Sequence, residues 1–166
     1  MYSVEYLNID AIDVQLLELL QDDASCSNQW LAAQAGISPP TCLRRVRRLH
    51  ESGLIERQVA ILNPDRLAAT VGHGLACIVE VSLDRQGAEH MDAFEAQAVA
   101  EPAVQQCWRV APGPDFMLVV HTRDMPGYLA LSQRLFTASA NVRNAKAFFS
   151  TKRAKFETRL PLPPTV

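Results

Sequence analysis

The segment from Ser38 to Ile55 constrains the fold of this chain more than any other part of the sequence. It opens with Ser38 and Pro39, which suit the start of a helix, because a serine hydroxyl accepts hydrogen bonds from free backbone N–H groups and proline fits the first helical position. It closes with Gly53, which suits the left-handed conformation that follows a helix. The segment therefore predicts one helix that begins after Ser38 and ends before Gly53.

This predicted helix has an apolar face and a basic face. The apolar residues follow an i, i+4, i+7 spacing, with one more at the edge: Cys42, Val46, Leu49 and Leu43. At about 3.6 residues per turn, Arg44 and Arg48 point away from that face, and Arg45 and Arg47 lie on its flanks. Guanidinium groups this close together repel one another unless an anion lies among them. The pattern favours a negatively charged partner.

A solvated helix whose charges pair locally is the alternative interpretation of the basic face. Arg47 and Glu51 stand at i, i+4, and we expect them to form such a pair. We expect Arg44, Arg45 and Arg48 to have no acidic neighbour. These three guanidinium groups would then be available to an external anion.

Two shorter helices are predicted ahead of the arginine-rich helix. The first covers residues 10–22, with Asp10 or Asn8 as its cap and an apolar stripe formed by Ile12, Leu16, Leu19 and Leu20. The second covers residues 28–35 after the capping residue Ser27, and a short glycine-containing turn joins it to the arginine-rich helix. Two helices joined in this way form a helix-turn-helix, whose second helix enters the major groove of DNA.

The residues predicted to contact DNA lie at the start of the arginine-rich helix and on its basic face: Ser38, Pro40, Thr41, Arg44, Arg45 and Arg48. For the three residues at the start, simple helix capping is the alternative. The net charge of −2 argues against a protein that coats nucleic acid without selection. A single basic stripe on a nearly neutral protein suits site-selective binding instead.

The chain divides into two predicted domains. Residues 54–62 are expected to be extended and to complete a helix-turn-helix domain over residues 1–62. A hinge follows over residues 63–74, and a second domain occupies residues 75–166. The tail of this second domain is rich in proline and is expected to be stiff.

The second domain shows strand periodicity interrupted by two helical segments. Strands are predicted at 75–83, 104–110, 115–123 and 142–155, and helices at 87–101 and 126–138. This β-α-β-β-α-β order predicts a ferredoxin-like domain, so the fold class is α+β with an all-α, winged-helix-like first domain. One face of the sheet stays uncovered and apolar, which predicts a homodimer packed sheet on sheet. A two-fold dimer matches a palindromic double-stranded site.

Several functional classes are disfavoured by the sequence. A hydrophobic content of 48% with 20% charged residues is typical of a soluble globular protein. No apolar run is long enough to cross a membrane and no signal peptide is visible, so we expect a cytoplasmic protein. The four cysteines lack metal-ligand spacing, and we predict neither a cofactor nor a metal site. Cys107 and His121 are conceivable as nucleophile and base, but no third residue orients them, so catalysis is not expected.

The helix-turn-helix segment from Ile37 to Leu49, closed by Gly53-Leu54-Ile55, resembles the Lrp/AsnC family of leucine-responsive transcriptional regulators. The segments Ile9–Asp13 and Ala60–Pro64 resemble the corresponding parts of that family, and so does the β-α-β-β-α-β half. The resemblance covers roughly residues 8–162. It implies dimers that assemble further, often to octamers, and transcription control by a small amino acid or related metabolite.

The resemblance also implies an effector site at Gly113 and Asp115 and, early in the last strand, at Ala145 and Ala147. The chain departs from the family pattern there, since Ala111-Pro112 replace a usual Thr-Gly and alanines replace hydroxyl-bearing residues. A zwitterion needs an anion for its ammonium group, a role open to Asp115, and donors for its carboxylate, which are fewer here. A simple turn role for Asp115 is the alternative. We therefore expect weak or unusual amino-acid binding.

A second hypothesis keeps the same fold without DNA binding. In that case the chain is a ligand-sensing or protein-interaction module whose helix-turn-helix contacts another protein. The free arginine face discriminates between the two hypotheses, because only DNA binding depends on those guanidinium groups.

Overall fold

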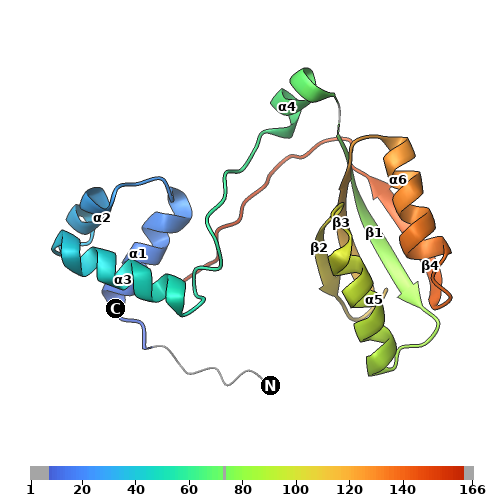
Figure 1. Ribbon diagram of the computed structural model, residues 1–166, viewed down its shortest axis with the longest axis horizontal. Coiled ribbons are helices and arrows are strands. Elements are labelled where there is room, and N and C mark those ends of the chain that lie inside the picture. Colours follow the sequence, from blue (N-terminus) through green and yellow to red (C-terminus); the bar gives the residue numbers. More distant parts are fainter. Residues whose placement is uncertain (1–7, 73, 163–166) are drawn as a thin grey trace. The chain divides into compact units, whose positions relative to one another are not determined.

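The computed structural model describes residues 8–72 and 74–162. The chain folds into two compact units, a helical one and one built on a sheet (Figure 1). The first unit contains the described residues up to Ile61 together with those from Lys155 onward, and the second unit contains Leu62–Ala154. No helix of the described ranges is both long enough and apolar enough to span a bilayer.

The first unit contains the three predicted helices, each within one residue of its expected ends: α1 at Ala11–Asp22, α2 at Asn28–Gln34 and α3 at Pro39–Glu51. Asp10 is the cap of α1. Its carboxylate accepts a hydrogen bond from the Asp13 N–H at 2.9 Å, and the Asp13 carboxylate accepts one from the Asp10 N–H at 3.2 Å. This reciprocal pair satisfies two backbone donors at the start of α1.

The start of α3 differs from the prediction in one detail. Ser38 occupies the cap position but its hydroxyl caps no backbone N–H, and it lies 2.9 Å from the Thr41 hydroxyl instead. The Asn28 side-chain amide donates to the Pro39 carbonyl at 2.8 Å and so ties the start of α2 to the start of α3. Gly53 has a φ of +77°, as expected for the residue that turns the chain after a helix.

A small apolar core holds the three helices together. Its buried members are Leu16, Leu31, Ala32 and Cys42, with Val46 and other partly buried side chains around them. Small residues such as Ala32 allow α2 to approach its neighbours closely. The apolar stripes predicted for the three helices therefore meet in one cluster.

The expected hinge contains a short helix that was not predicted from the sequence. Residues 54–63 form neither helix nor strand, and α4 then runs over Pro64–Val71. The side chain of Asn63 accepts a hydrogen bond from the Arg66 N–H at 3.1 Å, which is how a cap residue starts a helix. The Asn63-Pro64 pair, interpreted as the end of an extended segment, is also a helix start.

The second unit is a four-stranded antiparallel sheet with two helical segments, in the predicted β-α-β-β-α-β order. Its elements are β1 (Leu75–Leu83), α5 (Ala88–Ala100), β2 (Val104–Arg109), β3 (Phe116–Thr122), α6 (Met125–Ser132) continuing as the π-helix η1 (Gln133–Thr137), and β4 (Val142–Phe149). The strand order is β2-β3-β1-β4, so β1 is central and pairs with both β3 and β4. The last strand ends at Phe149, six residues before the predicted Lys155.

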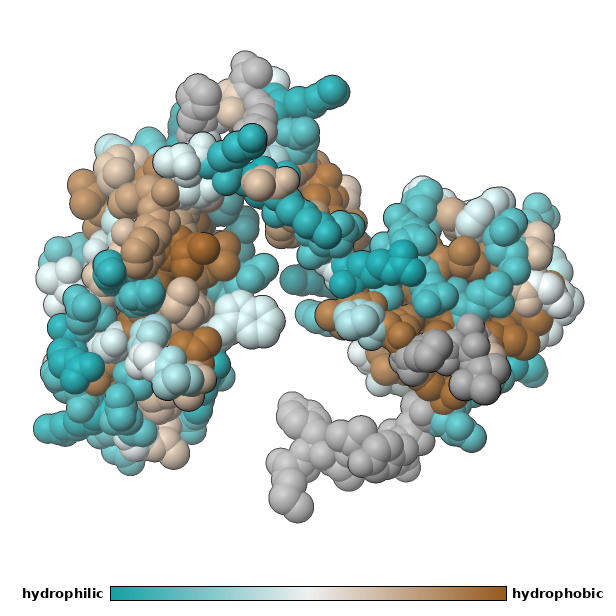
Figure 2. Space-filling model, turned by 180° about the vertical axis from the view of Figure 1, so that it is seen from behind, coloured by the Kyte–Doolittle hydropathy of each residue, from teal (hydrophilic) through white to brown (hydrophobic). Residues whose placement is uncertain are grey.

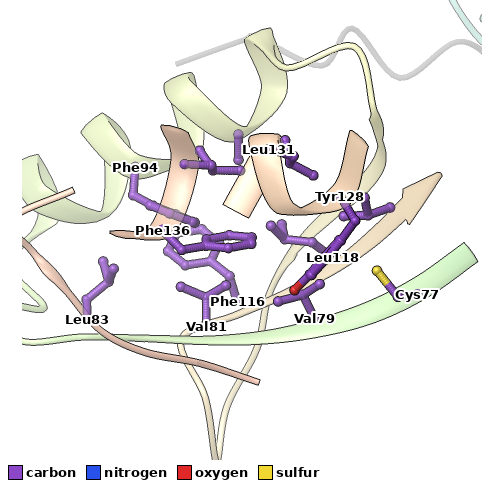
Figure 3. Close-up of a cluster of buried hydrophobic side chains, with 13 residues drawn as sticks. Cys77, Val79, Val81, Leu83, Phe94, Phe116, Leu118, Tyr128, Leu131 and Phe136 are labelled. Carbon is purple, nitrogen blue, oxygen red and sulfur yellow. The ribbon is translucent and has the colours of Figure 1, made fainter. Parts of the chain in front are cut away.

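The helices cover one face of this sheet. Alternate residues of β1 and β3 point toward α5 and α6, and the group labelled in Figure 3 includes Val79, Val81, Phe116 and Leu118. The rings of Phe94 on α5 and Phe116 are 4.8 Å apart. This is the principal core of the second unit, and it confirms the strand predicted at residues 75–83, in which buried and more exposed positions alternate.

The tail returns to the first unit. The Gln21 side chain accepts a hydrogen bond from the Leu160 N–H at 2.6 Å and donates one to its carbonyl at 3.2 Å. An ion pair joins Arg159 to Asp22 at the end of α1. Residues 155–162 thus belong with the helices and not, as predicted from the sequence, with the second domain.

Candidate nucleic-acid interface and effector residues

Helix α3 is anchored by its apolar side and leaves a polar side exposed. Cys42 and Leu49 are fully buried, one at each end of the helix. On the opposite side Arg44 is exposed and forms no ion pair with any residue the structure describes. Ser38 and Pro40 are exposed at the start of the helix, and Thr41 is half-buried beside them. The predicted apolar face is confirmed for Cys42, Val46 and Leu49, whereas Leu43 at its edge is exposed.

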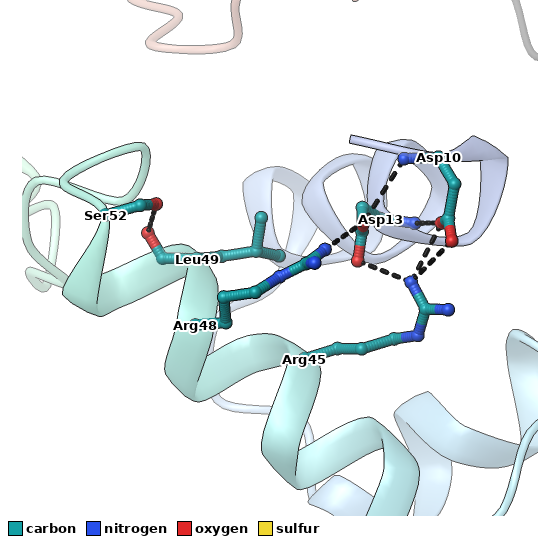
Figure 4. A network of polar contacts seen from close by, with 6 residues as sticks. All are labelled: Asp10, Asp13, Arg45, Arg48, Leu49 and Ser52. Carbon is teal, nitrogen blue, oxygen red and sulfur yellow. Dashed lines mark hydrogen bonds and ion pairs between the residues drawn. The ribbon is translucent and has the colours of Figure 1, made fainter. Parts of the chain in front are cut away.

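The expected isolation of Arg45 and Arg48 is wrong. Figure 4 shows Asp10 and Asp13 directed from the start of α1 toward these two arginines of α3. Arg45 Nη1 lies 2.8 Å from an oxygen of each carboxylate, and Arg48 Nη2 contacts the second oxygen of Asp13. These acids precede the arginines by more than thirty residues, so no local helical spacing reveals the contacts. The only sequence signal for these contacts is the position of Asp13 in the first turn of α1, close to the capping residue Asp10.

The network shifts the pKa of two of its members, Asp10 and Arg45. The Asp13 N–H and the Arg45 guanidinium both hold the pKa of Asp10 below its usual value. Hydrogen bonds to Asp13 and Asp10 raise the pKa of Arg45, so its charge is permanent. Asp13 itself is fully buried, and a buried carboxylate persists only when it is paired and hydrogen-bonded.

The predicted local pair on α3 is confirmed. Arg47 Nε lies 2.7 Å from the Glu51 carboxylate at the i, i+4 spacing, and both side chains are exposed. Exposed pairs of this kind contribute only about 0.3–0.5 kcal/mol, so Arg47 can exchange this partner for a stronger anion. Arg44 and Arg47 are thus the two arginines of α3 that no buried acid restrains.

Gly113 and Asp115 lie in the loop between β2 and β3. Gly113 has a φ of +122°, a conformation that side chains rarely adopt. The Asp115 carboxylate is buried and accepts a hydrogen bond from the Leu83 N–H at 2.6 Å, while its backbone N–H donates to the Val81 carbonyl at 2.9 Å. Asp115 therefore joins the loop to the end of β1, and only its second carboxylate oxygen is left for another partner.

Ala145 and Ala147 lie on β4 opposite Val81 and Val79 of β1. Both alanines pack against the core of the second unit. Their side chains lie on the helix-covered face of the sheet and provide no polar group there. The structure thus brings Gly113 and Asp115 together in one loop and leaves the two alanines as packing residues.

Cys107 and His121 do not form a catalytic pair. Cys107 packs against the helix-covered core, and burial raises the pKa of its thiol. The β2–β3 register places it opposite Leu118, whose side chain is also in that core. His121 lies three residues further along β3 and so projects from the other face. The two side chains are separated by the sheet.

The uncovered face of the sheet carries an apolar group that spans all four strands and lies beside Glu80 and Lys146. In register across the strands, Ile78 of β1 lies beside Val119 of β3 and Phe148 of β4. Trp108 of β2 lies beside Met117 of β3 on the same face. Figure 2 shows hydrophobic side chains gathered over this unit. We call these five residues the open-face patch, and it agrees with the predicted apolar face.

Comparisons with known proteins match both units. Residues 9–56 match the family of winged helix-turn-helix DNA-binding domains, and residues 76–160 match the Lrp/AsnC ligand binding domain. The chain is 34% identical to the leucine-responsive regulatory protein of Rhizobium meliloti over 149 residues, which cover 90% of this chain and 93% of that protein.

Two solved structures extend the likeness to the backbone. An AsnC family transcriptional regulator from Agrobacterium tumefaciens has a TM-score of 0.80 and 26% identity, covering 92% of this chain and 97% of its own. A transcriptional regulator from Neisseria meningitidis, solved as an L-Met complex, has a TM-score of 0.79 and 26% identity, covering 93% of this chain and 97% of its own. A helix-turn-helix with a basic exposed side, followed by a ferredoxin-like ligand-binding domain, identifies this chain as a member of the Lrp/AsnC family of transcriptional regulators.

Proposed function

We propose that this protein is a cytoplasmic transcriptional regulator that binds specific double-stranded DNA sites through α3. The observation that carries the proposal is the exposed side of α3, where Arg44 and Arg47 have no buried acidic partner and Arg48 keeps 45% of its side chain exposed. Ser38, Pro40 and Thr41 lie at the end of α3 that approaches base edges in a helix-turn-helix. We infer contacts from Arg44, Arg48 and these three residues.

A gel shift on a duplex from the region upstream of its own gene tests the proposal. The double variant Arg44→Ala and Arg48→Ala should lose retention of the duplex while keeping its oligomeric mass and, by circular dichroism, its helical content. Arg143→Ala is the matched control, because Arg143 is exposed on β4 of the second unit. Unchanged binding by the double variant at physiological salt would favour the alternative, an interaction module that does not bind DNA.

The binding unit would be a homodimer formed through the open-face patch, with further assembly up to octamers. A monomer leaves Ile78, Trp108 and Phe148 exposed on one face, and a second copy of the same face would cover them. A two-fold dimer presents two copies of α3 to the two halves of a palindromic site. A change in assembly geometry would change the spacing of these helices and hence the affinity for DNA.

A small amino acid is the proposed effector, bound near Gly113 and Asp115. The support is the ligand-binding domain match and the L-Met complex of the Neisseria meningitidis regulator. Pro112 and the core-facing Ala145 and Ala147 supply few donors for a carboxylate, so the affinity should be low or the preferred amino acid unusual. Calorimetry across the twenty amino acids tests this, and several tight binders would contradict it.

A further inference from the structure

One carboxylate on α1 holds two arginines of the DNA-facing helix. Asp13 is fully buried, one of its oxygens lies 2.8 Å from Arg45 Nη1, and the other contacts Arg48 Nη2. A buried carboxylate is strongly unfavourable without charged partners, so removing either arginine weakens the attachment of α3 to α1. The contact therefore links the start of the first helix to the middle of the recognition helix.

The two arginines use Asp13 differently. The Arg45 side chain is only 21% exposed, and its Nη1 lies among oxygens of Asp10 and Asp13. Its Nε is buried and has no hydrogen-bond partner among the described residues. This nitrogen is therefore enclosed by the protein and is not directed to solvent. Arg48 is 45% exposed and meets Asp13 through Nη2. Nearly half of the Arg48 side chain therefore still faces solvent.

The charges around α3 nearly cancel. Three carboxylates, those of Asp10, Asp13 and Glu51, contact Arg45, Arg48 and Arg47. Of the four arginines of α3, only Arg44 has no acidic partner among residues 8–72 and 74–162. Four guanidinium groups against three carboxylates leave one net positive charge. The helix is thus much less attractive to phosphate in general than its four arginines suggest.

We propose that Asp13 is a positioning residue for DNA recognition, which commits Arg45 to holding α3 against α1 and fixes Arg48 in one orientation toward DNA. The inference rests on the proposed DNA-binding function. A guanidinium held by a second partner loses less rotational freedom when it binds, so Arg48 is pre-organised. Arg45 touches no DNA, and Arg44 makes the unrestrained contact. Asp13 thereby contributes to selectivity from outside the interface.

Salt dependence separates an arginine that contacts DNA from one that does not. Each phosphate contact contributes about 0.9 to the slope of log affinity against log salt concentration. In Arg44→Met this slope should fall by about 0.9 per protomer, with the urea midpoint unchanged. In Arg45→Met the urea midpoint should fall and the slope should stay as in the wild type. Methionine keeps much of the apolar stem of arginine in both variants, so the pair is matched.

Asp13→Asn tests the positioning role directly. Without the Asp13 charge, Arg48 becomes available to phosphates, whereas Arg45 is still held by Asp10, so the slope of log affinity against log salt concentration should become steeper. The ratio of affinities for the upstream duplex and for a shuffled duplex of the same composition should fall about tenfold, since one oriented base contact is worth roughly that much. Asp10→Asn is the control, because Asp13 still holds both arginines there. A variant that has only lost structural stability would bind both duplexes more weakly, and its log affinity would not depend more steeply on log salt concentration.

Three results would each overturn the inference: a slope in Arg45→Met that falls as far as in Arg44→Met, an unchanged affinity ratio in folded Asp13→Asn, or a weaker affinity of that variant for both duplexes without a steeper slope. If circular dichroism shows that Asp13→Asn is unfolded, the salt slopes of Arg44→Met and Arg45→Met decide between the outcomes. A wild-type protein that binds neither duplex contradicts the proposed function itself. The two failures are therefore distinguishable.

Discussion

Ile78 and Phe148 lie directly opposite each other across the β1–β4 pair, and 47% and 43% of their surfaces are exposed. They lie at the centre of the open-face patch. Replacing Ile78 with Asp should place an uncompensated carboxylate in a sheet-on-sheet interface, which costs several kcal/mol when buried. We expect the dimer to dissociate, as measured by sedimentation velocity.

The matched control for that change is Val99→Asp. Val99 is 67% exposed on α5, away from the open-face patch, so the same substitution should leave the dimer intact. A dimer that persists in Ile78→Asp at micromolar concentration would show that the subunits meet elsewhere.

The tail contact at Gln21 should stabilise the first unit. Gln21→Ala removes two hydrogen bonds to the Leu160 backbone, and the free energy of unfolding of this unit should fall by about 1 kcal/mol. Urea denaturation followed by circular dichroism measures the loss. Gln29→Ala is the control, because Gln29 is an exposed helical glutamine on α2. Equal loss in the two variants would mean that the tail contact contributes nothing.

Two substitutions at Asp115 separate its structural role from its proposed effector role. Asp115→Ala leaves the buried Leu83 N–H without its acceptor, which should cost about 2 kcal/mol of stability in the second unit. Asp115→Asn keeps an oxygen acceptor but removes the negative charge. It should unfold close to the wild type while losing any binding of an amino-acid ammonium group. Thermal melts and calorimetry measure the two effects, and unchanged amino-acid binding in Asp115→Asn would exclude the charge role.

Acid should destabilise the first unit partly through Asp10. The pKa of Asp10 is lower in the folded chain than the value of about 3.9 expected when unfolded. Its contribution to stability is therefore fully present above that unfolded value and is lost as the pH falls through the lower, folded pKa. The urea midpoint should fall less between about pH 5 and pH 3 in Asp10→Asn than in the wild type. Asparagine keeps the capping oxygen, so helix α1 is preserved.

Asp23 accounts for part of the remaining acid sensitivity. Contacts with the Ser25 hydroxyl and N–H lower the pKa of Asp23 in the same direction. The variant Asp10→Asn retains this effect, so its profile should flatten only in part. Identical acid profiles in the variant and the wild type would contradict the role of Asp10.

Features set by local chemistry were predictable from the sequence. Asp10, Ser27 and Gly53 mark helix ends through backbone geometry and hydrogen bonds that span only a few residues. The strand periodicity of β1 was visible for the same reason. Helix α4 was missed because its start at Asn63-Pro64 also fits the end of an extended segment, and its exposed Leu67 and Val71 do not form a core stripe.

Long-range contacts were not predictable. The pairs of Arg45 with Asp10 and Asp13 join residues more than thirty positions apart, and charge spacing within a helix cannot reveal them. The exposed side of α3 was predicted correctly, but the division of its arginines between protein and solvent depends on how α1 packs. Asp115 shows the same limit, since its partner Leu83 lies 32 residues away.

Residues 155–162 determine when the first unit, which carries the helix-turn-helix, can complete its folding. Ribosomes release residues 155–162 after every strand of the sheet has been made, yet these residues bind the end of α1. The three helices can form early, but Gln21 and Asp22 can contact Leu160 and Arg159 only after every strand of the sheet has been synthesised. A truncated nascent chain would thus carry the whole sensor domain and still lack the last piece of its DNA-reading unit.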